Sequence, residues 1–270
     1  MAKIIYLFLF VGTFVSCARR PQYNDPIPKH DSFKIQSEKV NEERILNVWL
    51  PPEYENSQTS FPVMYMPDGG IREDFPHIAN TMAKLIANKS IPPFILVGIE
   101  NTDRRIDLTG FSETVSDSQY CPLSDGAKNF RAFITDELVL EIEKKYRVNA
   151  KKGIIGESLA GLFVMETFFL NPSTFDYYIA MDPSLWWNNH YLEKEAKNYL
   201  KNFPDKKTRL WFAGSSARDI SVHTNNLALT FEQEAPKNLI WKYSNQPKEK
   251  HHTIFRATKE KALIWTLNDD

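Results

Sequence analysis

One serine in this sequence is placed where a catalytic nucleophile could be held. Ser158 lies in Gly156-Glu157-Ser158-Leu159-Ala160-Gly161, after a short apolar run at 153–155 and before an apolar segment of helical spacing. A strand, a tight turn and a helix form a nucleophile elbow, which strains the serine backbone and exposes its Oγ. The N-terminus of the helix would offer backbone N–H groups to a developing oxyanion. The same spacing also fits a glycine-rich helix start with an incidental serine, so the surrounding elements must decide.

A serine nucleophile needs a base that takes its proton and an acid that orients the base. In hydrolases built on an α/β sheet, the acid and then the histidine follow the serine along the chain. Asp219 follows a predicted strand at 210–212, and His251 and His252 follow a predicted strand at 239–243. Because ligands bind beyond the carboxyl ends of the strands in such sheets, these groups can converge with Ser158.

Each of these assignments has an alternative. Asp219 could instead cap the helix that follows it, and Glu232 and Glu234 are weaker candidates for the acid because they lie inside that helix. His251 and His252 could belong to a solvated loop or bind a metal. No carboxylate–histidine spacing of the H-E-x-x-H kind accompanies them, so we expect neither a metal nor another cofactor.

The elements that must position these residues alternate between strands and helices. A predicted hairpin occupies 32–50, and it is followed by predicted strands at 61–66, 94–99, 153–155, 177–181, 210–212 and 239–243. Predicted helices lie at about 75–86, 130–146, 161–170, 189–200, 227–234 and 259–267. The alternation predicts an α/β fold with a mostly parallel, doubly wound sheet flanked by helices. Antiparallel edge strands at the N-terminus and no large cap domain complete the predicted architecture.

The composition is that of an ordinary globular protein. The 270 residues include six tryptophans, and the formal net charge is -1 with acidic and basic residues interspersed. This length and apolar content are sufficient for a large core, and the charge pattern argues against nucleic acid as a partner. No composition break indicates a second domain, so we expect one catalytic domain at 32–270.

The first 31 residues differ in kind from the rest. Lys3 precedes an apolar segment at 4–15, which is too short to span a bilayer but has the length of a secretory signal. Small residues just before Cys17 resemble a bacterial lipobox, which implies a signal peptide at 1–16 and a lipid on Cys17. Residues 17–31 would form a tether. These features predict a membrane-anchored, extracytoplasmic lipoprotein in the periplasm or at the cell surface, or a secreted protein if the lipobox is not processed.

Other residues are candidates for contact with a substrate. The polar segment 100–126 is too long for a simple connector, and we expect it at the mouth of the site. Trp186 and Trp187 could line a pocket for an aromatic acyl or catechol group, or pack in the core. Arg104 and Arg105 could bind an anionic substrate, or pair with neighbouring aspartates. Cys121 has no cysteine partner at a metal-ligand spacing, so we expect it to be structural.

Five stretches together resemble the putative-esterase family of α/β-hydrolases, which includes enterochelin esterases, feruloyl and acetyl-xylan esterases, and mycolyltransferases. They are Phe61-Pro62-Val63-Met64-Tyr65-Met66-Pro67-Asp68-Gly69; Ile91-Pro92-Pro93 with Val97-Gly98-Ile99; the sequence around Ser158; Pro183-Ser184-Leu185-Trp186-Trp187; and Glu249-x-His251-x-Thr253. The resemblance covers roughly residue 33 to the end, and its nearest subgroup is the siderophore esterases.

The resemblance implies roles for individual residues. Ser158 would be the nucleophile and His251, rather than its neighbour, the base. The oxyanion donors would be the backbone N–H of Leu159 and one N–H in the loop containing Gly69 and Gly70. Ala160 stands where the family often has glycine, and Asp182 where it often has serine. The acid is the least secure match.

The predicted function is hydrolysis of a carboxylic ester through an acyl-enzyme. The substrate would be a siderophore trilactone or a similarly bulky ester, because no inserted domain is available to enclose a long acyl chain. Three alternatives remain open at this point. They are a feruloyl- or acetyl-xylan-type carbohydrate esterase, an acyltransferase, and a surface-binding lipoprotein that has kept the fold without turnover.

Overall fold

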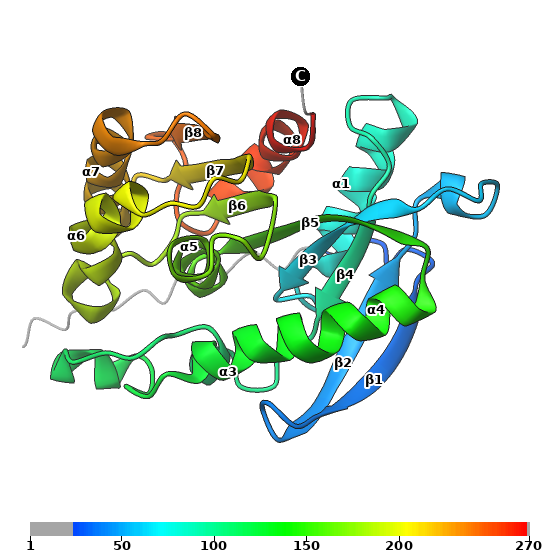
Figure 1. Ribbon diagram of the computed structural model, residues 1–270, viewed down its shortest axis with the longest axis horizontal. Helices are drawn as coiled ribbons and strands as arrows, with labels where there is room; N and C mark the ends of the chain where they lie inside the picture. Colours follow the sequence, from blue (N-terminus) through cyan, green and yellow to red (C-terminus); the bar gives the residue numbers. More distant parts are fainter. Residues whose placement is uncertain (1–23, 269–270) are drawn as a thin grey trace, which may run out of the picture.

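The computed structural model describes residues 24–268 and builds them around one twisted sheet (Figure 1). Within these residues the strands are β1 (Asp31–Ser37), β2 (Glu42–Trp49), β3 (Phe61–Pro67), β4 (Ile95–Ile99), β5 (Val148–Glu157), β6 (Tyr177–Met181), β7 (Thr208–Gly214) and β8 (Leu239–Asn245). Their order across the sheet is β1-β2-β4-β3-β5-β6-β7-β8. β1 and β2 pair antiparallel, β2 also pairs antiparallel with β4, and the remaining pairs are parallel. The predicted fold is therefore confirmed, including the antiparallel N-terminal edge.

Helices cover both faces of the sheet. They are α1 (Phe75–Ala87), α2 (Arg104–Asp107), α3 (Gly126–Phe133), α4 (Val139–Lys145), α5 (Leu159–Leu170), α6 (Trp187–Lys201), α7 (Arg218–Glu234) and α8 (Ile254–Leu267). Short 3-10 turns form η1 (Pro52–Tyr54) and η2 (Val115–Gln119), and a π-helical turn, η3 (Ile134–Leu138), joins α3 to α4. In Figure 1, α1 and α8 lie on one side of the sheet, and α3 to α7 lie on the other.

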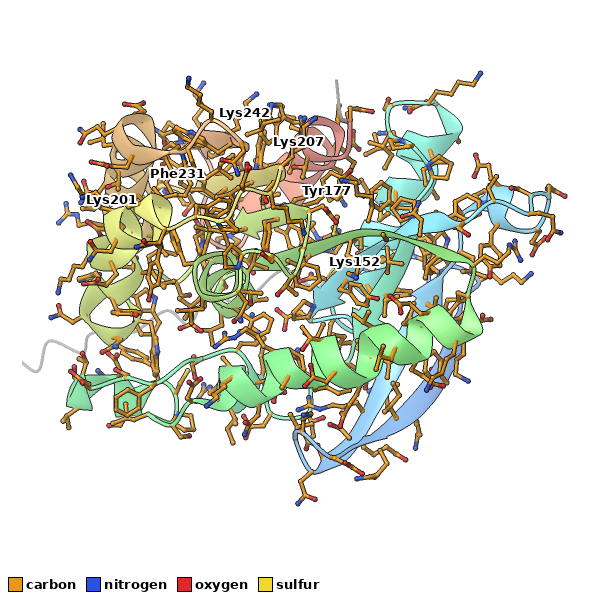
Figure 2. All side chains as sticks on the ribbon, in the orientation of Figure 1. Lys152, Tyr177, Lys201, Lys207, Phe231 and Lys242 are labelled. Atoms are coloured by element: carbon orange, nitrogen blue, oxygen red, sulfur yellow. The ribbon has the colours of Figure 1, made fainter. Side chains whose placement is uncertain are left out.

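The alternation of side chains along the strands explains this layering. In β3, Val63 and Tyr65 belong to the apolar core beneath α3 to α7, whereas Met64 and Met66 belong to the core beneath α1 and α8. Successive residues of a strand point to opposite faces, so a strand that is apolar throughout is buried on both. Phe231 of α7 is buried, whereas Lys201 and Lys242, which are also labelled in Figure 2, are exposed.

The central helix α5 is buried along most of its length. Its residues from Leu159 to Phe169 are all buried, including Phe163 and Phe168, which are fully enclosed. A helix that is apolar on all sides is stable only inside a protein. The residue that precedes this helix is thereby held on a rigid element.

A buried ion pair fixes part of the segment between β4 and α3. Arg44 of β2 is fully buried, and its guanidinium donates two hydrogen bonds of 2.6 and 2.7 Å to the Asp107 carboxylate at the end of α2. Burial raises the pKa of Asp107, and the guanidinium opposes that rise. The segment predicted as one long loop thus contains α2 and η2 and is tied to the sheet.

No helix within residues 24–268 combines the length and the apolar character that crossing a membrane requires. The predicted signal peptide at 1–16 and the predicted lipidation site at Cys17 lie outside the described residues. The described part of the predicted tether packs on the domain. Asp25 forms a two-pronged ion pair with Arg256 of α8, and the Pro26 carbonyl accepts a hydrogen bond of 2.7 Å from Asn80 of α1.

Candidate active site

Ser158 occupies the turn between β5 and α5, as the sequence predicts. Its backbone angles are φ 61° and ψ -118°, a left-handed conformation that costs free energy for a residue with a side chain. A Cβ added at Gly156 would come within 2.6 Å of the Ala160 backbone, and one at Gly161 within 2.8 Å of the Met181 carbonyl oxygen. The two glycines therefore allow the close approach of strand and helix that the turn requires. The Ala160 methyl is accommodated because Gly156 has no side chain.

Ser158 and His251 are hydrogen-bonded. The distance from Ser158 Oγ to His251 Nε2 is 3.0 Å, and His251 Nδ1 lies 2.7 Å from Oδ2 of Asp182. Asp182 is fully buried and also accepts hydrogen bonds from the Ser215 backbone N–H (2.5 Å) and the Ser215 hydroxyl (2.7 Å). A carboxylate held this firmly fixes the orientation of the imidazole, which leaves Nε2 able to accept the serine proton.

Asp219, the carboxylate predicted as the acid, is not part of this arrangement. α7 begins at Arg218, nine residues before the predicted start at 227, so Asp219 lies in the first turn of a helix and is exposed. Glu232 and Glu234 also lie in α7, and Glu234 pairs with Lys197. The structure therefore corrects the sequence prediction, and Asp182 is the carboxylate at His251.

A signal for Asp182 was present in the sequence. It directly follows the predicted strand at 177–181, which pairs with the strand that carries Ser158, and it lies between the serine and the histidine in chain order. Its aspartate was also one of the departures from the resembling family. Two strands in this region end near a carboxylate, and the sequence pattern alone does not show which one faces the histidine.

The two adjacent histidines face different surroundings. His251 bridges Ser158 and Asp182, whereas His252 is exposed on the wall of a neighbouring depression. The structure therefore brings the residue chosen as base, and not its neighbour, to the serine.

The predicted oxyanion donors differ in their availability. Leu159 is the first residue of α5, so its N–H has no carbonyl acceptor within the helix. The Gly69 N–H donates to the Ile99 carbonyl at 2.9 Å, and the Gly70 N–H donates to Glu73 Oε2 at 2.7 Å. Gly69 is thus committed to a backbone hydrogen bond, while the Gly70 donor is occupied by a side chain that can rotate away.

A surface depression of about 940 Å³ lies beside the Ser158–His251 pair. Its walls come from the loop after β3, the start of α1, the loop before α8 and the N-terminal segment. The lining residues are Asn24, Asp25, Ile27, Asp68, Ile71, Arg72, Glu73, Asp74, Pro76, His77, Asn101, Arg104, Glu157, His251, His252, Phe255 and Arg256. The predicted roof, segment 100–126, contributes only Asn101 and Arg104, and the N-terminal wall was not predicted.

Glu157, the residue before the serine, is the most perturbed carboxyl group of this depression. Burial raises its pKa to about 7, the positive charge of His251 opposes the rise, and Asp74 and Asp68 add to it. Its Oε1 lies 3.9 Å from His251 Nε2. A carboxyl group that titrates near neutrality therefore stands next to the base.

The predicted substrate-contacting residues separate into two groups. Arg104 lines the depression, but its guanidinium is bound by two hydrogen bonds of 2.6 and 2.7 Å to Asp68. Arg105 is exposed and does not line it. Trp187 is buried and donates from Nε1 to the Gly110 carbonyl, and half-buried Trp186 packs its ring edge-on to that of Tyr120. The tryptophans are therefore packing residues, the alternative that the sequence left open.

Comparison with known families and proteins gives a consistent result. The family described as "Putative esterase" matches residues 37–265 of the chain. A ferri-bacillibactin esterase of Bacillus subtilis is 36% identical over 85 residues, which are 31% of this chain and 29% of that protein. A siderophore enterobactin esterase of Emericella nidulans is 37% identical over 78 residues, 28% of this chain and 26% of that protein. The chain thus aligns with less than a third of the length of these two relatives.

Solved structures extend the likeness over nearly the whole domain. An IroE-like serine hydrolase from Shewanella oneidensis superimposes with a TM-score of 0.79 at 27% identity, covering 88% of this chain and 79% of that one. The similarity to this serine hydrolase therefore extends well beyond the short stretches matched in the two relatives.

Proposed function

Because the chain belongs to this esterase family, we propose that it hydrolyses carboxylic esters through an acyl-enzyme on Ser158. The observation that carries the proposal is the continuous hydrogen-bonded path from Ser158 Oγ through His251 to buried Asp182. In such an arrangement the serine attacks the ester carbonyl while the histidine takes the serine proton.

The two half-reactions then follow from the positions of these groups. His251 gives the proton to the departing alcohol as the carbon–oxygen bond of the ester breaks, which leaves the acyl group on Ser158. Water then attacks this acyl group, His251 takes a proton from the water, and the free acid leaves as the serine is protonated again. Asp182 remains ionised and stabilises the imidazolium in both steps.

The charge that develops on the carbonyl oxygen needs donors. The Leu159 N–H at the start of α5 is one, and the positive end of the helix dipole supports it. The Gly70 N–H is the second, once substrate displaces Glu73 from it. Gly69 has no such role because its N–H is bonded to the Ile99 carbonyl.

The substrate we propose is a bulky, soluble ester of the siderophore trilactone class. Two of the relatives described above are named as esterases of siderophores, and the depression of about 940 Å³ is large enough for a ligand of this class. Exposed Arg72 on its wall would attract the anionic groups of such a ligand. The volume suits a bulky ligand better than a single extended acyl chain.

A fluorophosphonate probe and a panel of esters test this function. Intact-mass measurement should show one phosphonyl adduct on the wild-type protein and none on Ser158→Ala. kcat/KM should then be compared for a catechol trilactone, a feruloyl saccharide, an acetylated xylo-oligosaccharide and long-chain p-nitrophenyl esters, each with and without an added alcohol acceptor. Adducts that persist in Ser158→Ala would refute the nucleophile, and a preference for long-chain esters would refute the substrate class.

We also propose that the mature protein begins at lipid-modified Cys17 and acts outside the cytoplasm, on the sequence pattern described above. Cys17→Ser should abolish incorporation of labelled fatty acid and leave the precursor unprocessed. Unchanged lipid labelling in that variant would contradict the proposal.

A further inference from the structure

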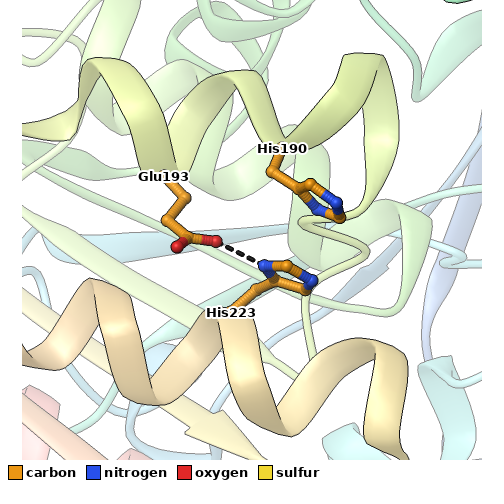
Figure 3. A group of neighbouring side chains, drawn as sticks. All are labelled: His190, Glu193 and His223. Atoms are coloured by element: carbon orange, nitrogen blue, oxygen red, sulfur yellow. Dashed lines mark hydrogen bonds and ion pairs between the residues drawn. The ribbon is translucent and has the colours of Figure 1, made fainter.

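A second group of chemically capable side chains lies between α6 and α7, outside the site described above. His190 and Glu193 come from α6 and face His223 of α7 (Figure 3). One possible ligand atom from each residue lies within 4.8 Å of those of the other two, and all three residues are half-buried. Two imidazoles and a carboxylate are a ligand set that zinc uses in proteins.

The hydrogen bonds of the cluster leave one nitrogen unused. His223 Nδ1 bonds to Glu193 Oε2, and Asn226 donates to Glu193 Oε1 at 2.8 Å. His190 Nδ1 is buried and has no partner of hydrogen-bonding geometry. The Leu185 carbonyl interacts with the His190 ring without meeting the geometry of a hydrogen bond at Nδ1, so this nitrogen is available to a metal ion.

The rings of His190 and His223 lie face to face. The centroids of the His190 and His223 rings are 3.7 Å apart and the rings are inclined by only 15°. A metal ion lies in the plane of each imidazole that binds it, so the two rings must turn out of this stack to share one ion.

The backbone at the start of α6 is strained in a way that brings His190 to the cluster. Asn188, Asn189 and His190 have φ values of 47°, 51° and 60°, in the left-handed region that residues with a side chain seldom occupy. Asn188 is held by hydrogen bonds from its N–H to Asp117 Oδ2 (2.8 Å) and from the Glu113 N–H to its Oδ1 (3.0 Å). The surrounding fold thus maintains a conformation that these residues would not adopt alone.

We propose that His190, Glu193 and His223 bind a Zn²⁺ ion that links α6 to α7, with water as a fourth ligand. Zinc–nitrogen distances of about 2.0–2.1 Å require the two rings to rotate out of their stack until an in-plane nitrogen lone pair of each points at the ion. Because Mg²⁺ and Ca²⁺ prefer oxygen ligands, the two imidazoles select a transition metal. This differs from the expectation, drawn from the sequence, that the chain binds no metal.

The position of the proposed ion gives it a structural consequence. α6 follows the loop that begins with Asp182, and α7 follows the loop with Ser215, whose side chain and N–H both bond to that aspartate. An ion that joins the two helices would therefore hold together the two loops that position the carboxylate. None of the three residues lines the depression beside Ser158 and His251, so the ion has a structural role in this proposal.

Zinc titration of the full-length protein after removal of metals with a chelator tests the proposal. Calorimetry should find one Zn²⁺ per chain, and Tm should rise by about 5–10 °C when free Zn²⁺ reaches roughly one hundred times its Kd. His223→Gln and Glu193→Gln should each lower the affinity at least tenfold and reduce the rise in Tm. His30→Ala is the matched control, because His30 lies outside the cluster, and it should bind like the wild type.

Repeating the titration with His251→Ala tests whether Zn²⁺ binds at His251 instead of at the proposed site. This variant should still bind one Zn²⁺ per chain. Co²⁺ substitution should add visible absorption bands that His190→Ala abolishes. Two results would overturn the proposal. One is unchanged affinity in all three cluster variants, and the other is stoichiometric binding without any rise in Tm. If a variant fails to fold, the remaining two and the Co²⁺ spectrum decide.

Discussion

Replacing Asp182 with asparagine is the most direct test of the site. The wild-type Oδ1 accepts the Ser215 N–H, and Oδ2 accepts both the Ser215 hydroxyl and His251 Nδ1. In Asp182→Asn, the amide oxygen must remain at the Ser215 N–H, so the amide NH₂ faces His251 Nδ1. The imidazole then carries its proton on Nε2, where it points at Ser158 Oγ and cannot accept the serine proton.

The expected loss can be stated in advance. A wrong histidine tautomer of this kind lowers kcat about 10⁴-fold, which corresponds to about 5 kcal/mol of transition-state stabilisation. Asp219→Asn is the matched control, because this carboxylate is exposed in the first turn of α7. Its kcat should stay within about twofold of the wild type, as expected for a surface substitution.

The assay is steady-state hydrolysis of a p-nitrophenyl acetate reporter together with the rate of fluorophosphonate labelling. Both rates should fall in Asp182→Asn while KM changes little and the circular dichroism spectrum is retained. A large loss in Asp219→Asn together with an active Asp182→Asn would refute the reasoning and restore the assignment drawn from the sequence.

Three further predictions concern stability and the turn at the nucleophile. Glu157→Gln should be more stable than the wild type by up to about 3 kcal/mol at pH 8 and equally stable at pH 4, measured by urea unfolding. The reason is that a carboxyl pKa raised from 4.5 to about 7 makes the native protein lose stability as pH rises between these values; equal stabilisation at both pH values would count against it. Gly156→Ala should lower both soluble yield and activity, because the new methyl would meet the Ala160 backbone at 2.6 Å, and an active, equally stable variant would show that the turn relaxes. Arg44→Met leaves the Asp107 carboxylate buried without its partner and should cost about 3–5 kcal/mol in thermal unfolding experiments; a loss below about 1 kcal/mol would mean that water reaches that carboxylate.

The order of strands and helices was predictable because each buried strand is an uninterrupted apolar run. The start of α7 was not, since Ser221 to Asn226 are weak helix formers and show no apolar periodicity before Leu227. In the structure, Thr224 of this stretch and Ile220 just before it are buried with Leu227, so packing extends the helix back to Arg218. Because of this extension, Asp219, which was predicted in a loop, lies exposed in the first turn of the helix.

The nucleophilic turn could be located from its strand–turn–helix pattern, and the base from the resemblance of Glu249-x-His251-x-Thr253 to the family, whereas the acid could not. A carboxylate after a strand is common, and its role depends on whether three donors surround it. The donors of Asp182 come from residues 33 and 69 positions further along the chain. Contacts at such separations leave no local pattern. The same reason applies to His190, Glu193 and His223, whose proximity depends on the packing of two helices.

The N-terminal segment at 24–27 both connects the domain to the residues before it and forms part of the depression beside His251. Asn24, Asp25 and Ile27 form part of the wall of the depression, and the ion pair of Asp25 with Arg256 keeps them there. Residues that connect the domain to whatever precedes it therefore also shape the space available to a ligand. Insertions or deletions between residues 24 and 28 would therefore alter ligand preference as well as the length of the connection to the preceding residues.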